Sequence, residues 1–94
     1  MKHFIETKDL EHNKTYIVLA YVDGYWYPKT VKVHKDTTVG FRDVEDESKC
    51  YWIYNLYVNQ KGVDENGAKI FDVVTFDSIE AAKELADFEN SIME

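Results

Sequence analysis

The dipeptide Asp23-Gly24, set between two strongly strand-forming segments, constrains the fold of this chain more than any other feature. Residues 16–22 read Y-I-V-L-A-Y-V, and residues 25–34 continue with similar β-branched and aromatic residues, which favour strands. Asp-Gly is a preferred filling of the two-residue type I′ turn, because both central positions need a positive φ. The sequence therefore predicts an antiparallel hairpin in which Val22 faces Tyr25.

The register of this hairpin determines which side chains share a face of the sheet. The face expected to meet the core is nearly all apolar and carries Tyr16, Val18, Ala20, Val22, Tyr25, Tyr27, Lys29, Val31 and Val33. The other face is apolar near the turn, where Tyr21 and Trp26 are neighbours, and polar away from it. Pro28 lacks an amide hydrogen, so it suits an edge position or a bulge.

The rest of the sheet is expected from four further segments. Residues 3–7 are expected to form a short first strand, and residues 36–49, which show no period, a long acidic loop. Residues 50–60 form a second strong strand in this interpretation. The turn residues K-G-V-D-E-N-G at 61–67 then lead into a returning strand over 68–76.

After residue 76 the hydrophobic period changes to that of a helix. Asp77 is the predicted N-cap, with Glu80 reaching back to it in a capping box. The face predicted to be buried carries Ile79, Ala82, Leu85, Ala86, Phe88, Ile92 and Met93, and the opposite face carries Glu80, Lys83, Glu84, Asp87, Ser91 and Glu94. The sequence thus predicts one α+β domain over residues 1–94, in which an antiparallel sheet of four to five strands, made of two hairpins, is packed by one C-terminal amphipathic helix.

Length and cysteine content place the chain among small reduced proteins. Its 94 residues fit one domain. Cys50 is the only cysteine, so no internal disulfide can form, and its strand-like context favours a buried small hydrophobe over a reactive thiol. No signal peptide and no apolar stretch long enough to span a bilayer is present. We therefore expect a cytoplasmic protein with no membrane association.

The residue pattern argues against catalysis, metal binding and cofactor binding. His3, His12 and His34 lack the short spacings of zinc sites. The acidic runs 43–47 and 64–67 lack the glycine turn and the distal glutamate of calcium loops. The glycines are scattered, so there is no phosphate loop, and no nucleophile has a base and an orienting group at a recognisable spacing. We expect no catalytic residue, no metal site and no cofactor, and hence no enzyme.

Charge is distributed unevenly along the chain. The net charge is -7, and residues 36–94 carry fourteen acids against five basic residues. This balance disfavours direct binding to nucleic acid, because phosphates need cationic partners. The only candidates for a basic groove are Lys29, Lys32, His34 and Lys35.

Two kinds of side chain are candidates for binding a partner. Ordered negative charge is expected on the helix and in the acidic loop, at Glu80, Glu84, Asp87, Asp43, Glu45, Asp46 and Glu47. A single helix covers only one face of a sheet, so some rings on the other face should stay exposed, with Tyr21, Trp26, Tyr51 and Tyr57 the candidates. Alternatively, the first strand, the loop 36–49 or a second subunit covers that face.

These features together favour a non-catalytic protein-binding module. Its partner would be a basic protein surface, and a nucleic-acid-processing enzyme that the chain inhibits is one such partner. In size, acidity and lack of a catalytic motif, the chain is similar to small proteins of phages and mobile elements, including inhibitors of CRISPR nucleases. The alternative is a self-assembling structural protein, a homodimer formed through edge strands or the Tyr/Trp surface.

Overall fold

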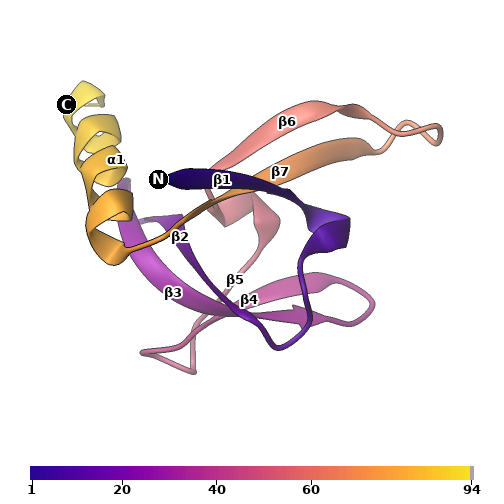
Figure 1. Cartoon of the computed structure of the whole chain (residues 1–94), viewed down its shortest axis with the longest axis horizontal. Coiled ribbons are helices and arrows are strands. Elements are labelled where there is room, and N and C mark those ends of the chain that lie inside the picture. Colours follow the sequence, from indigo (N-terminus) through magenta and orange to yellow (C-terminus); the bar gives the residue numbers. More distant parts are fainter. Residues whose placement is uncertain (94) are drawn as a thin grey trace.

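A computed structural model describes residues 1–93 and shows an antiparallel sheet of seven strands followed by one helix (Figure 1). The strands are β1 (Lys2–Glu6), β2 (Thr15–Val22), β3 (Tyr25–Lys35), β4 (Val39–Asp43), β5 (Cys50–Tyr51), β6 (Val58–Val63) and β7 (Lys69–Phe76). The helix is α1 (Ile79–Ile92), and two single 3-10 turns, η1 (Thr7–Asp9) and η2 (Ile53–Asn55), lie between strands. The predicted α+β class is confirmed, but the predicted number of strands, four to five, is too low.

The hairpin of β2 and β3 has the predicted register. Val22 pairs with Tyr25, and Tyr21 pairs with Trp26. Asp23 and Gly24 have φ angles of 51° and 89°, as a type I′ turn requires. β2 and β3 lie at the centre of the sheet, whose order is β1-β7-β2-β3-β4-β5, with β6 also paired to β7.

The segment predicted as an acidic loop over 36–49 contains a strand. β4 pairs with β3, and Phe41, opposite Val33, is fully buried. The sequence pattern hides this strand because Gly40 and the buried Asp43 occupy positions where a strand normally carries apolar residues. Only the remainder of the segment, between β4 and β5, is an irregular acidic loop.

The single strand predicted over 50–60 is interrupted. β5 covers only Cys50–Tyr51, and the turn η2 then redirects the chain before β6 begins. The amide of Trp52 donates to the side-chain oxygen of Asn55 at 3.1 Å, and the amide of Asn55 donates to the Trp52 carbonyl at 2.8 Å. This turn carries the chain from β5, which pairs with β4, to β6, which pairs with β7. Tyr54 in the turn is exposed, and Leu56 directly after it is buried.

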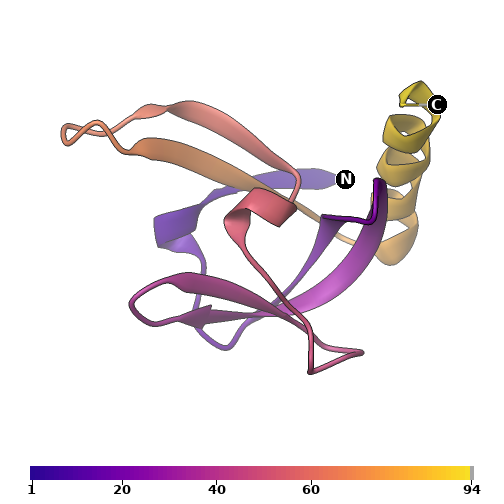
Figure 2. The same ribbon diagram turned by 180° about the vertical axis from the view of Figure 1, so that it is seen from behind.

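Two hydrophobic clusters lie on opposite faces of the central hairpin. The first is enclosed by the curled sheet itself, because β2, β3, β4, β5 and β7 all contribute to it: Leu10, Val18, Ala20, Val31, Val33, Phe41, Tyr51, Leu56 and Val73. The second lies under α1 and contains Leu19, Val74, Phe76, Ala82 and Ala86. Figure 2 shows α1 at one side of the molecule and the β4–β5 segment folded across the inner face. Away from its turn, both faces of the hairpin are therefore covered. Near the turn, Tyr25 and Tyr27, which are predicted on the core face, are exposed instead.

Two details of the helix differ from the prediction. Ser78, not Asp77, is the N-cap, and its side chain accepts from the Ala81 amide at 3.1 Å. Asp77 instead lies 2.7 Å from the His3 ring nitrogen, between the helix start and β1. No helix within residues 1–93 is long and apolar enough to cross a membrane.

The apolar stripe of α1 is wider than its contact with the sheet. Only Ala82 and Ala86 are buried, because their small side chains let the helix approach the sheet closely. Near the C-terminal end, the side chain of Asn90 accepts from the Trp26 amide at 2.8 Å and donates to the Trp26 carbonyl at 3.0 Å. The prediction of a fully buried stripe is wrong for four members, which are exposed: Ile79, Phe88, Ile92 and Met93.

Candidate binding surfaces

Asp43 and Tyr51 do not belong to the surface. Both are buried, and the Tyr51 hydroxyl donates to the Asp43 carboxylate at 2.9 Å. The amide of Glu45 donates to the same carboxylate at 2.9 Å, and the Lys29 ammonium lies 3.5 Å from it. This cluster fastens the β4–β5 loop to the sheet. Asp43 and Tyr51, which were predicted to bind a partner, therefore lie in the interior and hold the loop in place.

The cluster shifts the pKa of both buried groups. Burial alone would raise the pKa of Asp43, but hydrogen bonds from Tyr51 and the loop amides, with the charge of Lys29, outweigh it and hold that pKa below its ordinary value. Burial, followed by the hydrogen bond and charge of Asp43, raises the pKa of Tyr51 to about 12. Around neutral pH the pair is therefore a carboxylate accepting from a neutral phenol.

The loop that Asp43 fastens presents the other predicted acids. Glu45 and Glu47 are exposed. Asp46 is half-buried and accepts from the hydroxyl and the amide of Ser48, which lowers the pKa of its carboxyl group. The loop is thus acidic at its surface but ordered by its own hydrogen bonds.

The predicted aromatic residues Tyr21, Trp26 and Tyr57 form one cluster of rings in tilted and edge-to-face contact. The Trp26 ring centroid lies 5.0 Å from that of Tyr21 and 5.2 Å from that of Tyr57. The Tyr57 hydroxyl donates to Glu89 at 2.9 Å, and burial together with this bond raises the pKa of Tyr57. Because Trp26 and Tyr57 pack beneath α1, Tyr21 is the one ring of the three that is well exposed. This ring cluster therefore connects the helix to the sheet.

The predicted acidic face of α1 is exposed and lies beside uncovered apolar side chains. Glu80 and Glu84 have no salt bridge within residues 1–93, whereas Asp87 is bound by Lys83 at 2.8 Å. Phe88 is 59% exposed and Ile92 is 62% exposed. A groove of about 300 Å³ runs between the helix and β1, lined by Met1, Lys2, Phe76, Ala81, Glu84, Leu85 and Phe88. We call it the helix groove.

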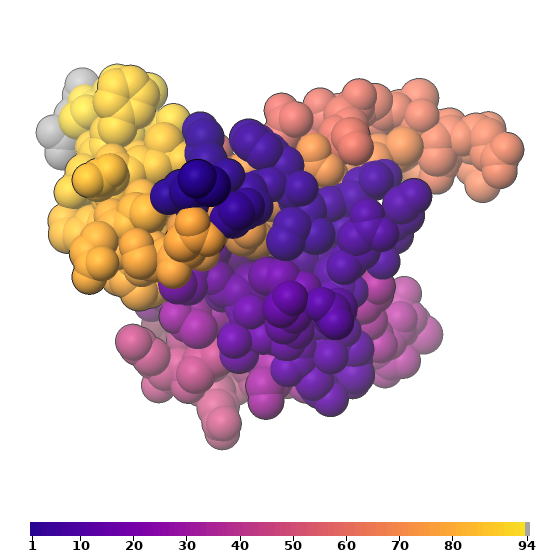
Figure 3. Space-filling model, viewed as in Figure 1, coloured from indigo at the N-terminus to yellow at the C-terminus, as the bar shows by residue number. Residues whose placement is uncertain are grey.

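Figure 3 views the molecule from the side of this groove. The N-terminal residues, indigo, lie directly beside the orange and yellow atoms of the helix. On the β1 side, Phe4 is exposed and pairs with Val74, which belongs to the cluster under the helix. The helix groove therefore continues an apolar layer that α1 only partly covers. Sequence reasoning missed Phe88 and Phe4, because helical periodicity and β-propensity place both in the core.

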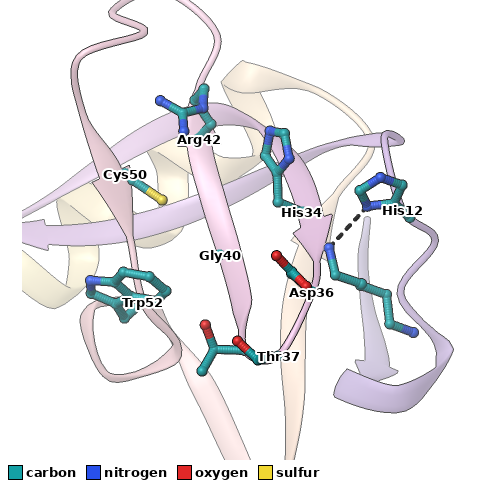
Figure 4. Close-up of a pocket in the computed structure, with 10 residues that line it drawn as sticks. His12, His34, Asp36, Thr37, Gly40, Arg42, Cys50 and Trp52 are labelled. Carbon is teal, nitrogen blue, oxygen red and sulfur yellow. Dashed lines mark hydrogen bonds between the residues drawn. The ribbon is translucent and has the colours of Figure 1, made fainter.

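A second surface that sequence reasoning missed surrounds Trp52. The Trp52 side chain is 50% exposed and Tyr54 is 84% exposed. A cavity of about 490 Å³ adjoins Trp52 and is lined by His12, His34, Lys35, Asp36, Thr37, Thr38, Gly40, Arg42, Cys50 and Trp52 (Figure 4). The pattern of residues 50–60 predicts one regular strand and does not indicate the turn η2, which exposes these rings.

Within residues 1–93 no three His, Cys, Asp or Glu side chains come together as a metal site. Two histidines do meet, His12 and His34, whose ring centroids are 5.8 Å apart. Nδ1 of His12 accepts from the Lys35 amide at 2.9 Å, so in the neutral ring the proton lies on Nε2.

Comparison with known proteins returns no match of this chain to a protein family, a curated protein or a solved structure.

Proposed function

We propose that this chain is a non-catalytic protein-binding module that docks a basic protein surface into the helix groove. The observation that carries the proposal is the position of Phe88 and Ile92. Both are largely exposed, and at four-residue spacing they continue the same row of the helix that carries Glu80 and Glu84 one and two turns earlier. An apolar patch rimmed by charge is typical of a protein–protein interaction site.

The acidic charge of the helix favours a cationic partner. Over residues 77–93 the chain carries five acids and a single lysine, Lys83, and that lysine is occupied by Asp87. Within residues 1–93, Lys2 supplies the one basic side chain that lines the groove. Such a field attracts a cationic partner and speeds encounter, while the apolar side chains hold the complex. A nucleic-acid-processing enzyme has a cationic surface of this kind, and occupying it would inhibit the enzyme.

The rival function is self-assembly through the same groove. A parallel pairing of two copies of α1 would set Glu80 and Glu84 of each copy against those of the other, and an antiparallel pairing would set them against Ile92 and Phe88. Both arrangements are unfavourable, because the first opposes like charges and the second buries charge against apolar side chains. Light scattering at micromolar concentration distinguishes the two functions, because the binding module is a monomer on its own. A dimer that dissociates on Phe88→Ser would overturn the proposal in favour of self-assembly.

The test is a selection from a random peptide display library, with the purified chain as bait. The expected peptides combine Lys or Arg with large apolar residues, and their binding weakens with added salt. The variant Phe88→Ser/Glu84→Lys should abolish binding, since it removes the central ring and reverses a charge at exposed positions that add little to the stability of the fold.

The matched control is Tyr54→Ser/Glu65→Lys. It removes a ring that is even more exposed, 84% against 59% for Phe88, and reverses a charge that is also exposed, both away from the groove. The proposal expects it to bind like the unmodified chain. Peptides without a basic, apolar preference, or equal losses in the two variants, would contradict the assignment of the groove.

A further inference from the structure

The outer face of β3, β4 and β5 carries two short rows of side chains around Trp52. Lys32 pairs with Arg42, and Arg42 pairs with Cys50, which sets two cations side by side. In the next row His34 pairs with Gly40, and the Trp52 ring lies on the other side of that glycine. We call these residues, with Tyr54 beyond them, the Trp52 face.

Gly40 leaves a hollow between two rings. A β-carbon at this position would come within 3.2 Å of the Cys50 sulfur and 3.5 Å of the Trp52 ring, so a side chain here would crowd the ring. Figure 4 shows Trp52 and Cys50 on one side of Gly40, with His34 and His12 on the other and Arg42 at one end. The hollow is thus walled by flat rings, against which a planar group can stack.

Cations without an acidic partner gather at this face. Six lysines form salt bridges with acids: Lys8, Lys14, Lys29, Lys49, Lys61 and Lys83. Of the five Lys and Arg side chains that form none within residues 1–93, four lie on or beside the Trp52 face, namely Lys32, Lys35, Arg42 and Lys69. The Arg42 Nη1 donates to the Glu47 carbonyl at 2.7 Å, which holds the guanidinium in place with its charge uncompensated.

A second cavity, of about 680 Å³, adjoins the first across Trp52. Both cavities are lined by Thr37, Thr38 and Trp52. The second adds Tyr54, packed edge to face against Phe71 with ring centroids 6.4 Å apart, and Lys69. The two cavities therefore form one continuous surface. It carries the exposed rings of Trp52 and Tyr54 and, on either side of them, Arg42 and Lys69, which form no salt bridge.

We infer that the Trp52 face binds a short segment of single-stranded nucleic acid. Bases would stack on Trp52 and Tyr54, and backbone phosphates would lie against Arg42, Lys32 and Lys69. Stacking rings within a cationic groove is the arrangement by which proteins hold single strands without reading their sequence. Asp36, the one acid lining the first cavity, lies on the far side of Gly40 from Arg42 (Figure 4), where a sugar hydroxyl or a base amino group can donate to it.

Net charge and local charge lead to different expectations here. The net charge of -7 disfavours nucleic-acid binding by the chain as a whole. The lysines outside this face, however, mostly form salt bridges with acids, whereas the cations of this face form none. The acidic loop next to Arg42 limits the contact to a few nucleotides. The inference goes beyond the proposed function and uses a surface that shares no residue with the helix groove, so either can fail alone.

The test is fluorescence anisotropy of a labelled oligothymidylate of about eight nucleotides at low salt. Trp52→Ala should weaken binding about tenfold, the loss of one stacked base. Because the Trp52 ring lies close to Gly40 of β4, Tyr54→Ser provides a second variant at a ring that is 84% exposed, with the same direction of effect. Lys32→Gln should weaken binding a few-fold and make the salt dependence shallower by about 0.7 in log–log slope.

Lys2→Gln is the matched control, because Lys2 is also exposed and without a salt bridge but lies on β1. It should leave the affinity unchanged. Equal effects of Lys2→Gln and Lys32→Gln, or unchanged affinity in both ring variants, would overturn the inference. So would a duplex of the same length that binds as tightly as the single strand, or a mononucleotide that competes as well as the oligonucleotide.

Discussion

Replacement of Asp43 by alanine should destabilise the fold by about 3–4 kcal/mol. The substitution leaves the buried Tyr51 hydroxyl and the Glu45 amide without their acceptor and removes the carboxylate partner of Lys29. An unsatisfied buried group costs about 1–3 kcal/mol, and breaking a buried charged pair about 3–5 kcal/mol. A domain of this length has a free energy of unfolding of about 5–14 kcal/mol, so the variant still folds and the loss is measurable by urea denaturation.

A double-mutant cycle tests the reasoning behind this value. Tyr51→Phe alone should cost about 2 kcal/mol, because it removes one hydrogen bond to a charged group. In the Asp43→Ala background the same change should cost nothing, since the hydroxyl already lacks its acceptor. The expected coupling energy is therefore about 2 kcal/mol. Additive costs in the two backgrounds would show that the bond observed at 2.9 Å contributes no stability.

The same pair predicts how stability depends on pH. The pKa of Asp43 is lowered from its ordinary value of 3.8, so its contribution is complete above that pH and is lost as the pH falls through the pKa of the folded state. The pKa of Tyr51 is raised from 10.0 to about 12, so its contribution is complete below pH 10 and is lost as the pH rises towards 12. Denaturation of Tyr51→Phe across the alkaline range should lack this loss, and an unchanged alkaline profile would refute it.

Three further predictions concern the framework that positions both surfaces. Gly24→Ala should cost about 1 kcal/mol in urea denaturation, because the φ of 89° suits glycine alone; no cost would argue against the type I′ turn. Asn90→Ala should cost about 1–2 kcal/mol, because the amide and carbonyl of Trp26 lose their partner, and a shift in Trp26 fluorescence should accompany it. Ala86→Leu should cost about 1–3 kcal/mol in melting experiments, because Ala86 is closely packed between helix and sheet, and a neutral result would mean that this contact is loose.

Local sequence signals predicted the elements that are stabilised locally. The β2–β3 hairpin follows from Asp23-Gly24, and the position of α1 from the change in hydrophobic period. Periodicity could not show how far the helix is covered, because that depends on the sheet beneath it. Two alanines are the buried residues of the helix, and Phe88 stays 59% exposed.

The elements that were missed depend on contacts between distant parts of the chain. β4 is a strand because Phe41 fits between Val33 and Tyr51, although its sequence contains a glycine and an aspartate. For the candidate surfaces, charge alone identified Glu80 and Glu84 as exposed. Charge alone could not show that Asp43 is buried. Its burial depends on the Tyr51 hydroxyl, the Glu45 amide and the Lys29 ammonium, which the fold brings to its carboxylate.

The most direct test of the helix groove is a chemical-shift titration of the isotopically labelled chain with the peptide recovered from the display selection. The groove assignment predicts shift changes concentrated in residues 81–92 of the helix and in residues 1–4, at the start of β1. It also predicts that the amides around Trp52 stay unchanged and that Phe88→Ser/Glu84→Lys removes the effect. Shift changes that spare the helix, or that persist in this variant, would contradict the account.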